Sequence, residues 1–586
     1  MGVGQLALIS SVSIPIWGKL GSCGKMAACV ASRVFSQASK IMAQTSPEPL
    51  VTLRLTGLVQ SLEEGDSELL ARAARRLGIG ELDLRGARIA RRSVDARRRP
   101  PRLPVQVDLV VRAGFQSRAL AREERSGYLR PAPIPGSLMP DKHAGPIGRG
   151  HIVVVGSGPA GVFAALPLAL GGASVTVLER GAVLEDRHRR LVPFHRGRAL
   201  DPETNLLFGE GGAGTYSDGK LYTRIDDPLE VPILEELVAC GAPAEIRFDA
   251  RAHIGTEGLH ALLPRLRQRL IDAGVTFAFD TRFEGLELDE GPPRRVTGVR
   301  TSQGPLACDG LILATGHSAR DTWRILAGQG VPFEAKAFQF GVRIEHPQEM
   351  ITSARYGSEA ELLGPASYSL TCKGSGQTQS VHSFCMCPGG RVVASVNEER
   401  TLCTNGMSNA THSSPWANSG LVVTVNPDQF AGAADDPFRG TNFQHEQERA
   451  AFEAGGGTYA APAQRADDFL AGRLSSGELK TSLVFGAQAA RLDELLPGFV
   501  TLALRQALKR FEAQIPGYSG SDGLLLGVES RSSGPIRIPR DSETRLVRGF
   551  SNLQAVGEGA GWAGGIMSAA IDGAGAAQCL YSLGNS

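Results

Sequence analysis

The sequence predicts an α/β protein whose core is a doubly wound parallel sheet with a dinucleotide site. Three stretches that lie far apart in the chain support this fold class: residues 151–181, 308–321 and 551–580. Each contains an apolar strand that runs into a glycine turn, and the first and last continue into a helix of small residues. Sheets of this kind bind ligands at the carboxyl ends of their strands, where these turns lie.

The first stretch carries the strongest signal. Its strand, Ile152–Val155, leads into GSGPAG, in which Gly156, Gly158 and Gly161 have the spacing GxGxxG. The first glycine permits a tight turn, the second lets a pyrophosphate approach the backbone, and the third lets helix and strand pack closely. The helix N-terminus then offers free N–H groups to phosphate. Pro167 lies within the expected helix and predicts a bend in its axis.

A second strand follows this helix and ends on an acid. GxGxxG alone is a weak signal in a chain with 72 glycines, but here the strand, the helix and the acid agree. A carboxylate at this place accepts hydrogen bonds from ribose hydroxyls. The residues of this stretch that we expect at the cofactor are Gly156, Gly158, Pro159, Ala160, Gly161, Glu179 and Arg180.

Length and composition limit the possible partners and location of the protein. The chain has 586 residues and a net charge of +2, so no global basicity points to nucleic acid as a partner. Residues 1–47 are rich in serine, mildly basic and free of acids, which is typical of an organellar transit peptide. Lysine outnumbers arginine there, which favours the plastid stroma over the mitochondrion; a disordered tail is the alternative. We find no apolar run long enough to span a membrane.

Residues 48–130 predict a small separate α/β unit with strands at 51–55 and 105–111 and a helix at 67–77. Within it, residues 85–102 form an arginine-rich segment, which is usually a solvated face. Contact with an acidic partner or with cofactor phosphates is the alternative, and the lack of interleaved aromatic residues makes nucleic acid the weakest candidate. The proline and glycine content of residues 131–149 predicts a semi-rigid linker.

A glycine-rich loop follows the first unit at residues 205–225. Its bare backbone would let a planar ring lie on the main chain, with N–H groups at the polar edge of the ring, as such loops do in flavoproteins. A flexible surface loop is the alternative. The candidate cofactor contacts in this loop are Gly211, Gly212, Gly214, Thr215, Ser217 and Lys220.

The middle of the chain returns to the first sheet. A buried strand at 311–314 runs into Thr315 and Gly316, which we expect at the cofactor, and His317 follows at the same strand end. Residues 336–535 lack a second GxGxxG, so we expect a mixed domain that covers the cofactor and only a transient visit by NAD(P)H.

Residues 381–390 of that domain contain His382, Cys385 and Cys387. Three interpretations stay open for them: a packed strand, a redox dithiol, or part of a metal site. The metal site is the weakest of the three because zinc and iron–sulfur sites normally need four ligands. We therefore expect no metal, and we keep His317, His382, Cys385 and Cys387 as catalytic candidates.

The end of the chain repeats the arrangement of strand, glycine turn and helix. The strand at 553–556 runs into a turn, and a small-residue helix begins near Gly564. The positive end of the helix dipole could stabilise the negative charge that reduction places on a flavin. The candidate contacts are Gly557, Glu558, Gly564, Gly565 and Ile566.

On these motifs, the chain resembles a family of FAD-dependent dehydrogenases found in bacteria and plant plastids. Some members of that family are labelled electron-transfer flavoprotein:quinone oxidoreductases. The resemblance covers nearly everything after residue 48. It implies FAD, a glutathione-reductase-type core, an inserted mixed α+β cap and an N-terminal ferredoxin-like domain. The matching segments are GSGPAG at 156–161, FGEGGAGTYSDGKL at 208–221, ATGHSARD at 314–321, FGVRIEHPQ at 340–348, FCMCPGG at 384–390, TNGMS at 404–408, ANSGLVV at 417–423, APAQRADDFL at 461–470 and GEGAGWAGGIMSAAIDG at 557–573.

We therefore expect an FAD-dependent oxidoreductase that passes hydride or electrons from a small-molecule substrate through a non-covalent flavin. The expected division is a core in two parts, 150–335 and 536–586, with a cap that binds substrate at 336–535. Two alternatives stay open: a binding or regulatory protein that is stabilised by flavin and uses the arginine-rich face at 85–102, and a quinone reductase.

Overall fold

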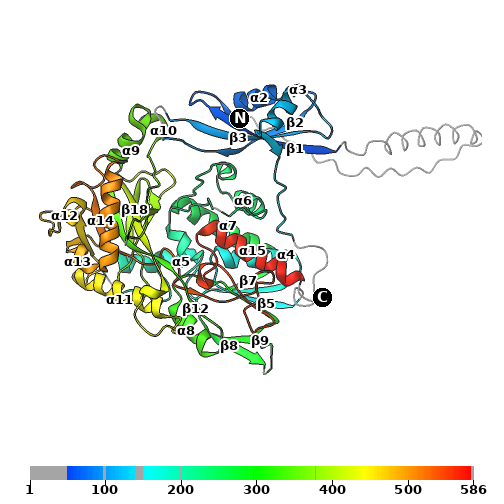
Figure 1. The fold of residues 1–586 in the computed structure, drawn as a ribbon. Coiled ribbons are helices and arrows are strands. Elements are labelled where there is room, and N and C mark those ends of the chain that lie inside the picture. Colours follow the sequence, from blue (N-terminus) through cyan, green and yellow to red (C-terminus); the bar gives the residue numbers. More distant parts are fainter. Residues whose placement is uncertain are drawn as a thin grey trace, which may run out of the picture.

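The computed structural model describes residues 49–96, 101–139, 150–197, 199–223, 225–289, 291–376 and 378–582. The expected transit peptide at 1–47, most of the linker at 131–149 and Arg97–Arg99 of the arginine-rich segment lie outside these residues. Figure 1 shows a small N-terminal lobe above two larger parts, with helix α15 and strand β5 in the part that lies directly below it.

The N-terminal lobe has the ferredoxin-like fold that the resemblance implies. Its elements are β1 (Leu50–Gln60), α2 (Asp66–Arg76), β2 (Leu84–Arg92), β3 (Leu103–Arg112), α3 (Arg118–Arg125) and β4 (Leu129–Pro131). The strands form an antiparallel sheet in the order β2-β3-β1-β4. Alternate residues of β3, such as Val105 and Val107, point into the core beneath the helices, as the period of a half-buried strand requires.

A parallel sheet in the order β23-β11-β5-β6-β7 forms the centre of the molecule, which confirms the doubly wound core. Its strands are β5 (His151–Val155), β6 (Ser174–Leu178), β7 (Val275–Ala278), β11 (Gly310–Leu313) and β23 (Leu553–Ala555). Strand β6, the next strand in the chain, lies on one side of β5, and β11, which begins about 160 residues after β5, lies on the other. The strand order therefore reverses between β5 and β11. This reversal is where doubly wound sheets bind their ligands.

Both faces of this sheet are buried, as parallel sheets require. Ile152 and Val154 face the helices α4 (Pro159–Leu170), α7 (Thr256–Asp272) and α15 (Ile566–Ser582). Val153 and Val155 face the other side, which is covered by a three-stranded sheet and a helix. These are β8 (Phe283–Asp289), β9 (Arg295–Thr301), β10 (Gly304–Ala307) and α8 (Arg320–Gly328).

Helix α4 continues through Pro167 to Leu170, so the proline does not end it. Helix α15, drawn in red in Figure 1, packs along α4 although about 400 residues separate the two in the chain. The contact is close, because a Cβ on Gly573 would stand 2.0 Å from the carbonyl oxygen of Ala160. The hydroxyl of Tyr581 donates to the carbonyl of Leu168 near the other end of α4. The C-terminal segment thereby completes the core that residues 150–335 begin.

The cap is built on a seven-stranded mixed sheet in the order β14-β15-β18-β13-β21-β19-β20. Its strands are β13 (Phe338–Pro347), β14 (Thr371–Cys372), β15 (Val381–Cys387), β18 (Trp416–Val425), β19 (Ala461–Arg465), β20 (Ala487–Ala489) and β21 (Leu524–Glu529). The hairpin β16 (Gly390–Ala394) and β17 (Thr404–Ser408) and the short pair β12 (Glu334–Ala335) and β22 (Ile536–Arg537) accompany it. The remaining α-helices of the described chain are α5 (Leu184–His195), α6 (Glu230–Ala239), α9 (Gln348–Tyr356), α10 (Ala360–Leu363), α11 (Arg439–Ala454), α12 (Ala466–Ala471), α13 (Leu492–Leu495) and α14 (Gly498–Glu512).

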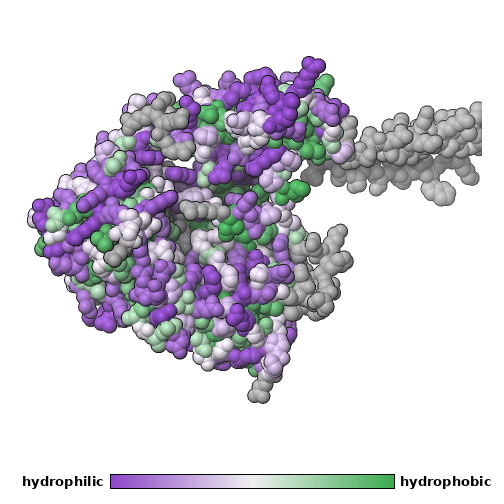
Figure 2. Space-filling model, viewed as in Figure 1, coloured by the Kyte–Doolittle hydropathy of each residue, from purple (hydrophilic) through white to green (hydrophobic). Residues whose placement is uncertain are grey.

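The N-terminal lobe contacts the core through the arginine-rich segment. The backbone N–H of Arg92 donates to the carbonyl of Phe248, and Ala250 donates back to Arg92. The Arg92 guanidinium lies over the Phe248 ring and binds Asp66, while Arg88 binds Asp108. Figure 2 shows mostly hydrophilic residues on the visible face, with hydrophobic residues grouped where this lobe meets the rest. Part of the arginine-rich segment therefore serves structure within the chain.

Candidate cofactor and active site

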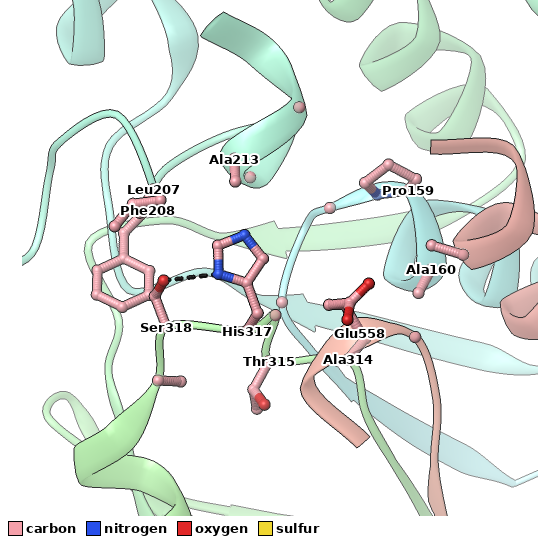
Figure 3. A pocket seen from close by; sticks show the side chains of 18 of the residues that line it. Pro159, Ala160, Leu207, Phe208, Ala213, Ala314, Thr315, His317, Ser318 and Glu558 are labelled. Carbon is pink, nitrogen blue, oxygen red and sulfur yellow. Dashed lines mark hydrogen bonds between the residues drawn. The ribbon is translucent and has the colours of Figure 1, made fainter. Parts of the chain in front are cut away.

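A cavity opens at the carboxyl ends of β5 and β11, at the point where the strand order reverses. It is lined by parts of the cap and by residues from four segments that the sequence analysis identified: 151–181, 205–225, 308–321 and 551–580. Figure 3 shows Pro159, Ala213, His317 and Glu558 around it. The predicted site residues that line this cavity are Gly156, Gly158, Pro159, Ala160, Glu179, Arg180, Gly212, Gly214, Ser217, Lys220, Thr315, Gly316, His317, Cys385, Gly557, Glu558, Gly565 and Ile566.

Six predicted residues lie elsewhere. Gly161 packs against the first turn, and Gly564 packs against the Glu558 carboxylate, 2.8 Å from where its Cβ would be. Gly211 and Thr215 line a smaller apolar cavity next to helix α7. Cys387 is fully buried behind Cys385. His382 lies in β15, paired with Thr371 and Val422, and is not among the residues that line the main cavity.

The N-terminus of α4 fits a phosphate group. Gly158 caps this helix without a side-chain hydrogen bond, and the first turn contains no acidic residue, so the N–H groups and the positive dipole end stay available. A Cβ on Gly158 would meet no protein atom within 4 Å, and the same holds for Gly316 and Gly565. Three bare backbone positions therefore face the space where a ligand would approach, which is the arrangement that a dinucleotide needs.

Glu179 is buried and holds three backbone segments together. Its carboxylate accepts hydrogen bonds from the N–H groups of Ser157, Gly181 and Gly209 at 3.0 Å each, and from the Ser157 hydroxyl at 2.7 Å. A carboxylate has about four acceptor sites, so this set occupies them. Glu179 therefore positions the phosphate turn and the glycine-rich loop, and a ribose hydroxyl would have to replace the Ser157 hydroxyl.

Arg187, which the sequence did not single out, shapes the glycine-rich loop. Its guanidinium is fully buried and donates to the backbone carbonyls of Asn205, Gly209, Glu210 and Gly212 at 2.6–3.2 Å. It also lies over the Tyr216 ring, 4.9 Å from the centroid. Burial lowers the pKa of Arg187 to about 10, so the side chain remains charged at neutral pH. An arginine one helical turn into α5 carries no sequence signal for this role.

Arg180 also lines the cavity and lies just after the end of strand β6. It pairs with Glu203 and Asp321, at 2.8 Å and 2.9 Å, and its guanidinium lies 4.3 Å from the centroid of the Phe208 ring. Burial opposes its charge, but these two carboxylates raise the pKa of Arg180 above its ordinary value. The ion pairs hold a flat, cationic surface at the place where the β6 strand ends.

His317 points into the cavity from the end of β11, and its Nδ1 lies 2.8 Å from the Ser318 hydroxyl (Figure 3). Burial, with the positive charges of Arg531 and Arg320 nearby, lowers the pKa of His317 to about 4. The imidazole is therefore neutral at physiological pH and can both donate and accept a hydrogen bond.

Those two arginines belong to a buried ion cluster behind His317. Arg320 and Arg531 each make bidentate contacts with the Glu448 carboxylate, at 2.7–3.0 Å. The Glu448 carboxylate is fully buried; burial opposes its charge, but the two guanidinium groups hold the pKa of Glu448 well below its usual range. The cluster joins α8 of the core to α11 and the end of β21 in the cap, so it fixes the cap over the cavity.

Lys220 lies on the cap side of the cavity in a second buried ion cluster. Its ammonium is 2.5 Å from Asp218 and 3.9 Å and 3.8 Å from the sulfurs of Cys385 and Cys387. Burial opposes the charge of Asp218, but Lys220 and hydrogen bonds from His412 and Ser408 hold the pKa of Asp218 well below its usual range. Lys220, proposed from sequence as a cofactor contact, thus reaches from the glycine-rich loop to the cysteines of the cap.

The profile of one protein family, described as FAD-dependent protein, C-terminal domain-like, matches residues 337–532. A profile described as a domain of unknown function matches residues 52–110. A protein of Clostridium beijerinckii, described as uncharacterized, is 37% identical over 533 residues, which are 89% of this chain and 97% of its own length. The chain belongs to this family of FAD-dependent proteins. FAD is its cofactor, and the open N-terminus of α4 with the bare glycines of the main cavity fits the pyrophosphate of that molecule.

The matches to solved structures are weaker. Glycine oxidase from Bacillus cereus is 9% identical with a TM-score of 0.33, and the match covers 74% of this chain and 95% of that one. A thioredoxin reductase from Gloeobacter violaceus is 20% identical with a TM-score of 0.17, over 29% of this chain and 38% of that one. The chain thus spans less than half the length of that reductase.

No helix in the described part of the chain is both long and apolar enough to cross a bilayer. Across the same residues, no three His, Cys, Asp or Glu side chains come together in a way that could hold a metal ion.

Proposed function

We propose that this protein is an FAD-dependent oxidoreductase that accepts hydride or electrons from a small-molecule substrate through a non-covalently bound flavin. The observation that carries the proposal is the cavity itself. Its core side offers bare glycine backbone and the N-terminus of α4, while its cap side offers polar groups of Ser532, Asn405 and Lys220. A cavity with one face suited to a cofactor and the other suited to a polar reactant is the arrangement of an enzyme site.

FAD supplies two-electron redox chemistry at its ring when it is bound. The residues of this chain would bind and orient the reactants. Gly158 and the α4 N-terminus would hold the pyrophosphate, and the loop that Arg187 supports would lie along the ring. The N-terminus of α15, which begins at Ile566 after Gly565, would place the positive end of its dipole at the cavity.

His317 is the group best placed to move a proton. It is neutral, lines the cavity and contacts the Ser318 hydroxyl, so its imidazole can accept a proton from a substrate and pass it through a hydrogen bond. The charges of Arg320 and Arg531 behind it oppose a lasting imidazolium, which favours transfer of the proton onward. We propose a proton-transfer role for His317 and none for His382, which lies outside the cavity lining.

The test is a spectroscopic titration of the purified, FAD-loaded protein without oxygen. A panel of small-molecule reductants, with NADH and NADPH included as transient donors, should contain at least one that bleaches the flavin band. Reoxidation by a soluble quinone would identify a quinone reductase, and reoxidation by oxygen alone would favour an oxidase. If dithionite reduces the flavin but no donor of the panel does, the result would contradict the oxidoreductase. It would favour the binding or regulatory protein that uses the arginine-rich face.

We propose the plastid stroma as the location, with the mitochondrion as the alternative. The support is the serine-rich, acid-free composition of residues 1–47. Fusion of residues 1–47 to a fluorescent protein tests the idea in plant cells. Plastid fluorescence is the expected result, and diffuse cytosolic fluorescence would contradict it.

A further inference from the structure

Cys385 and Cys387 lie at a bulge in the cap strand β15, at the edge of the cofactor cavity. Phe384 pairs with Gly420 and Cys387 with Asn418, so three steps along β15 face two along β18. The backbone at Cys385 has φ of 45°, a left-handed conformation that is uncommon for a residue with a side chain. Cys385 lines the cavity at this bulge, whereas Cys387 does not line it and is fully buried.

A cation lies against both sulfurs. The Lys220 ammonium is 3.9 Å from the Cys385 sulfur and 3.8 Å from the Cys387 sulfur, and Asp218 fixes it from the other side at 2.5 Å. The guanidinium of Arg343, paired with Glu529 at 2.7 Å, lies beneath and donates to the carbonyl of Cys385 at 3.4 Å. Two cysteines that only fill space in a core have no need of a buried ammonium, whose desolvation is costly.

The two thiols are electrostatically unequal. A hydrogen bond from Cys387, together with the charges of Lys220 and Arg343, lowers the pKa of the Cys385 thiol well below its ordinary value, against the opposing effect of burial. The hydrogen bond to Cys385 and burial raise the pKa of Cys387. These effects favour the thiolate at the half-buried Cys385 and the thiol at the buried Cys387. Dithiol sites that react with disulfides need this asymmetry, because the thiolate attacks first and the thiol resolves.

We propose that Cys385 and Cys387 form a redox-active dithiol that exchanges with a small-molecule disulfide in the cofactor cavity. The Cys385 thiolate attacks one sulfur of the disulfide, which forms a mixed disulfide and releases one thiolate. Cys387 then loses its proton to that thiolate and attacks the Cys385 sulfur, which closes the Cys385–Cys387 disulfide and releases the second thiolate. The external disulfide gains two electrons and the protein dithiol loses two, so the exchange balances.

Two electrons and one proton return the internal disulfide to a thiolate and a thiol. In the cell this return rests on the proposed function, since the flavin beside the pair would supply the electrons. In the experiment dithiothreitol supplies them. The exchange half-reaction can therefore be tested without any turnover of the flavin.

The first experiment measures the thiolate directly. The FAD-loaded protein is alkylated with iodoacetamide between about pH 6 and pH 8, where an ordinary thiol changes its thiolate fraction roughly a hundredfold, and each cysteine peptide is quantified by mass spectrometry. Cys385 should react at a rate that hardly changes with pH. Cys579, a half-buried thiol outside the cavity lining, provides an internal control. In Lys220→Met the Cys385 rate at neutral pH should fall at least about tenfold. A steep pH dependence of Cys385 in the wild type would overturn the proposal.

The second experiment measures stoichiometry. The reduced wild-type protein, treated with glutathione disulfide, should release two glutathione thiols per chain and yield a cross-linked Cys385–Cys387 peptide. Cys387→Ser should release one thiol and retain glutathione on Cys385, whereas Cys385→Ser should release none from this site. Cys403→Ser, a buried cysteine outside the cavity lining, is the matched control and should behave as wild type. A wild-type protein that stops at the mixed disulfide, or does not react, would overturn the proposal regardless of how the variants fold.

Discussion

A Cβ on Gly161 would stand 1.9 Å from the carbonyl oxygen of Gly156. The first turn of α4 therefore lies directly on the backbone of the strand turn, and only glycine permits this contact. Gly158, between the two, has the opposite environment, since no protein atom lies within 4 Å of where its Cβ would be. One glycine of the motif thus serves packing, and another leaves room for the ligand.

Gly158→Ala separates these roles. Its φ of −72° suits alanine, so the fold and the melting temperature should be close to those of the wild type. The added methyl faces the cavity, and FAD affinity should fall at least tenfold, which is about 1.4 kcal/mol. Gly161→Ala is the contrasting control and should lose soluble, folded protein. Equal FAD affinity in Gly158→Ala and wild type, measured by fluorescence titration, would contradict the placement of the pyrophosphate.

Arg187→Met should loosen the glycine-rich loop. Several backbone carbonyls would lose their donor, and each buried carbonyl left unpaired costs about 1–3 kcal/mol. We expect lower thermal stability together with weaker FAD binding, and faster proteolysis near residues 205–216. Arg189→Met changes an exposed arginine on the same helix and should leave all three unchanged. If both variants behave alike, Arg187 does not support the loop.

Glu448→Gln tests the ion cluster that joins core and cap. The change leaves Arg531 buried without a carboxylate and leaves Arg320 with Glu398 alone, and breaking a buried pair costs about 3–5 kcal/mol. Chemical denaturation should show a loss of this size. Glu446→Gln, at an exposed position of the same helix, should be neutral. A Glu448→Gln protein as stable as the wild type would mean that other contacts hold the cap.

The buried His346 should make the free energy of unfolding fall in acid. Burial lowers its pKa to about 4, so between about pH 6.5 and pH 4 the unfolded chain binds a proton that the folded chain does not. Folding stability contributed by this residue therefore falls as pH decreases, by up to about 1.4 kcal/mol per pH unit. His346→Gln keeps a donor for the Tyr518 carbonyl and should flatten the dependence by that amount. Denaturation curves across this pH range provide the measurement, and parallel slopes would contradict the assignment.

The core of the fold follows from local sequence patterns. Gly156, Gly158 and Gly161 lie where the motif requires, and the glycine turns at 315–316 and 557–565 meet them at one cavity. Each of these patterns spans only a few residues. Turns and helix N-termini are determined by residues adjacent in the chain, so the sequence alone predicts them. The βαββαβ order of the N-terminal lobe matches the expectation drawn from the family resemblance.

Contacts between distant segments had no such signal. Lys220 and Cys385 are separated by 165 positions in the chain, and nothing local to either shows that the ammonium reaches the sulfur. The same holds for Arg187 beneath the glycine-rich loop and for Glu448 between its two arginines. For Glu179 the sequence indicated the place but not the set of backbone donors that occupy its carboxylate. Long-range polar contacts depend on the tertiary fold, so they appear only once it is known.

The central claim is that the cavity brings a reductant to bound FAD. Anaerobic titration of the FAD-loaded wild type with small-molecule donors tests it most directly, with Gly158→Ala as the variant that should bind FAD at least about tenfold more weakly. We predict that at least one donor bleaches the flavin of the wild type at a saturable rate. Failure of every donor, NADH and NADPH included, while dithionite still bleaches the flavin, would contradict the claim.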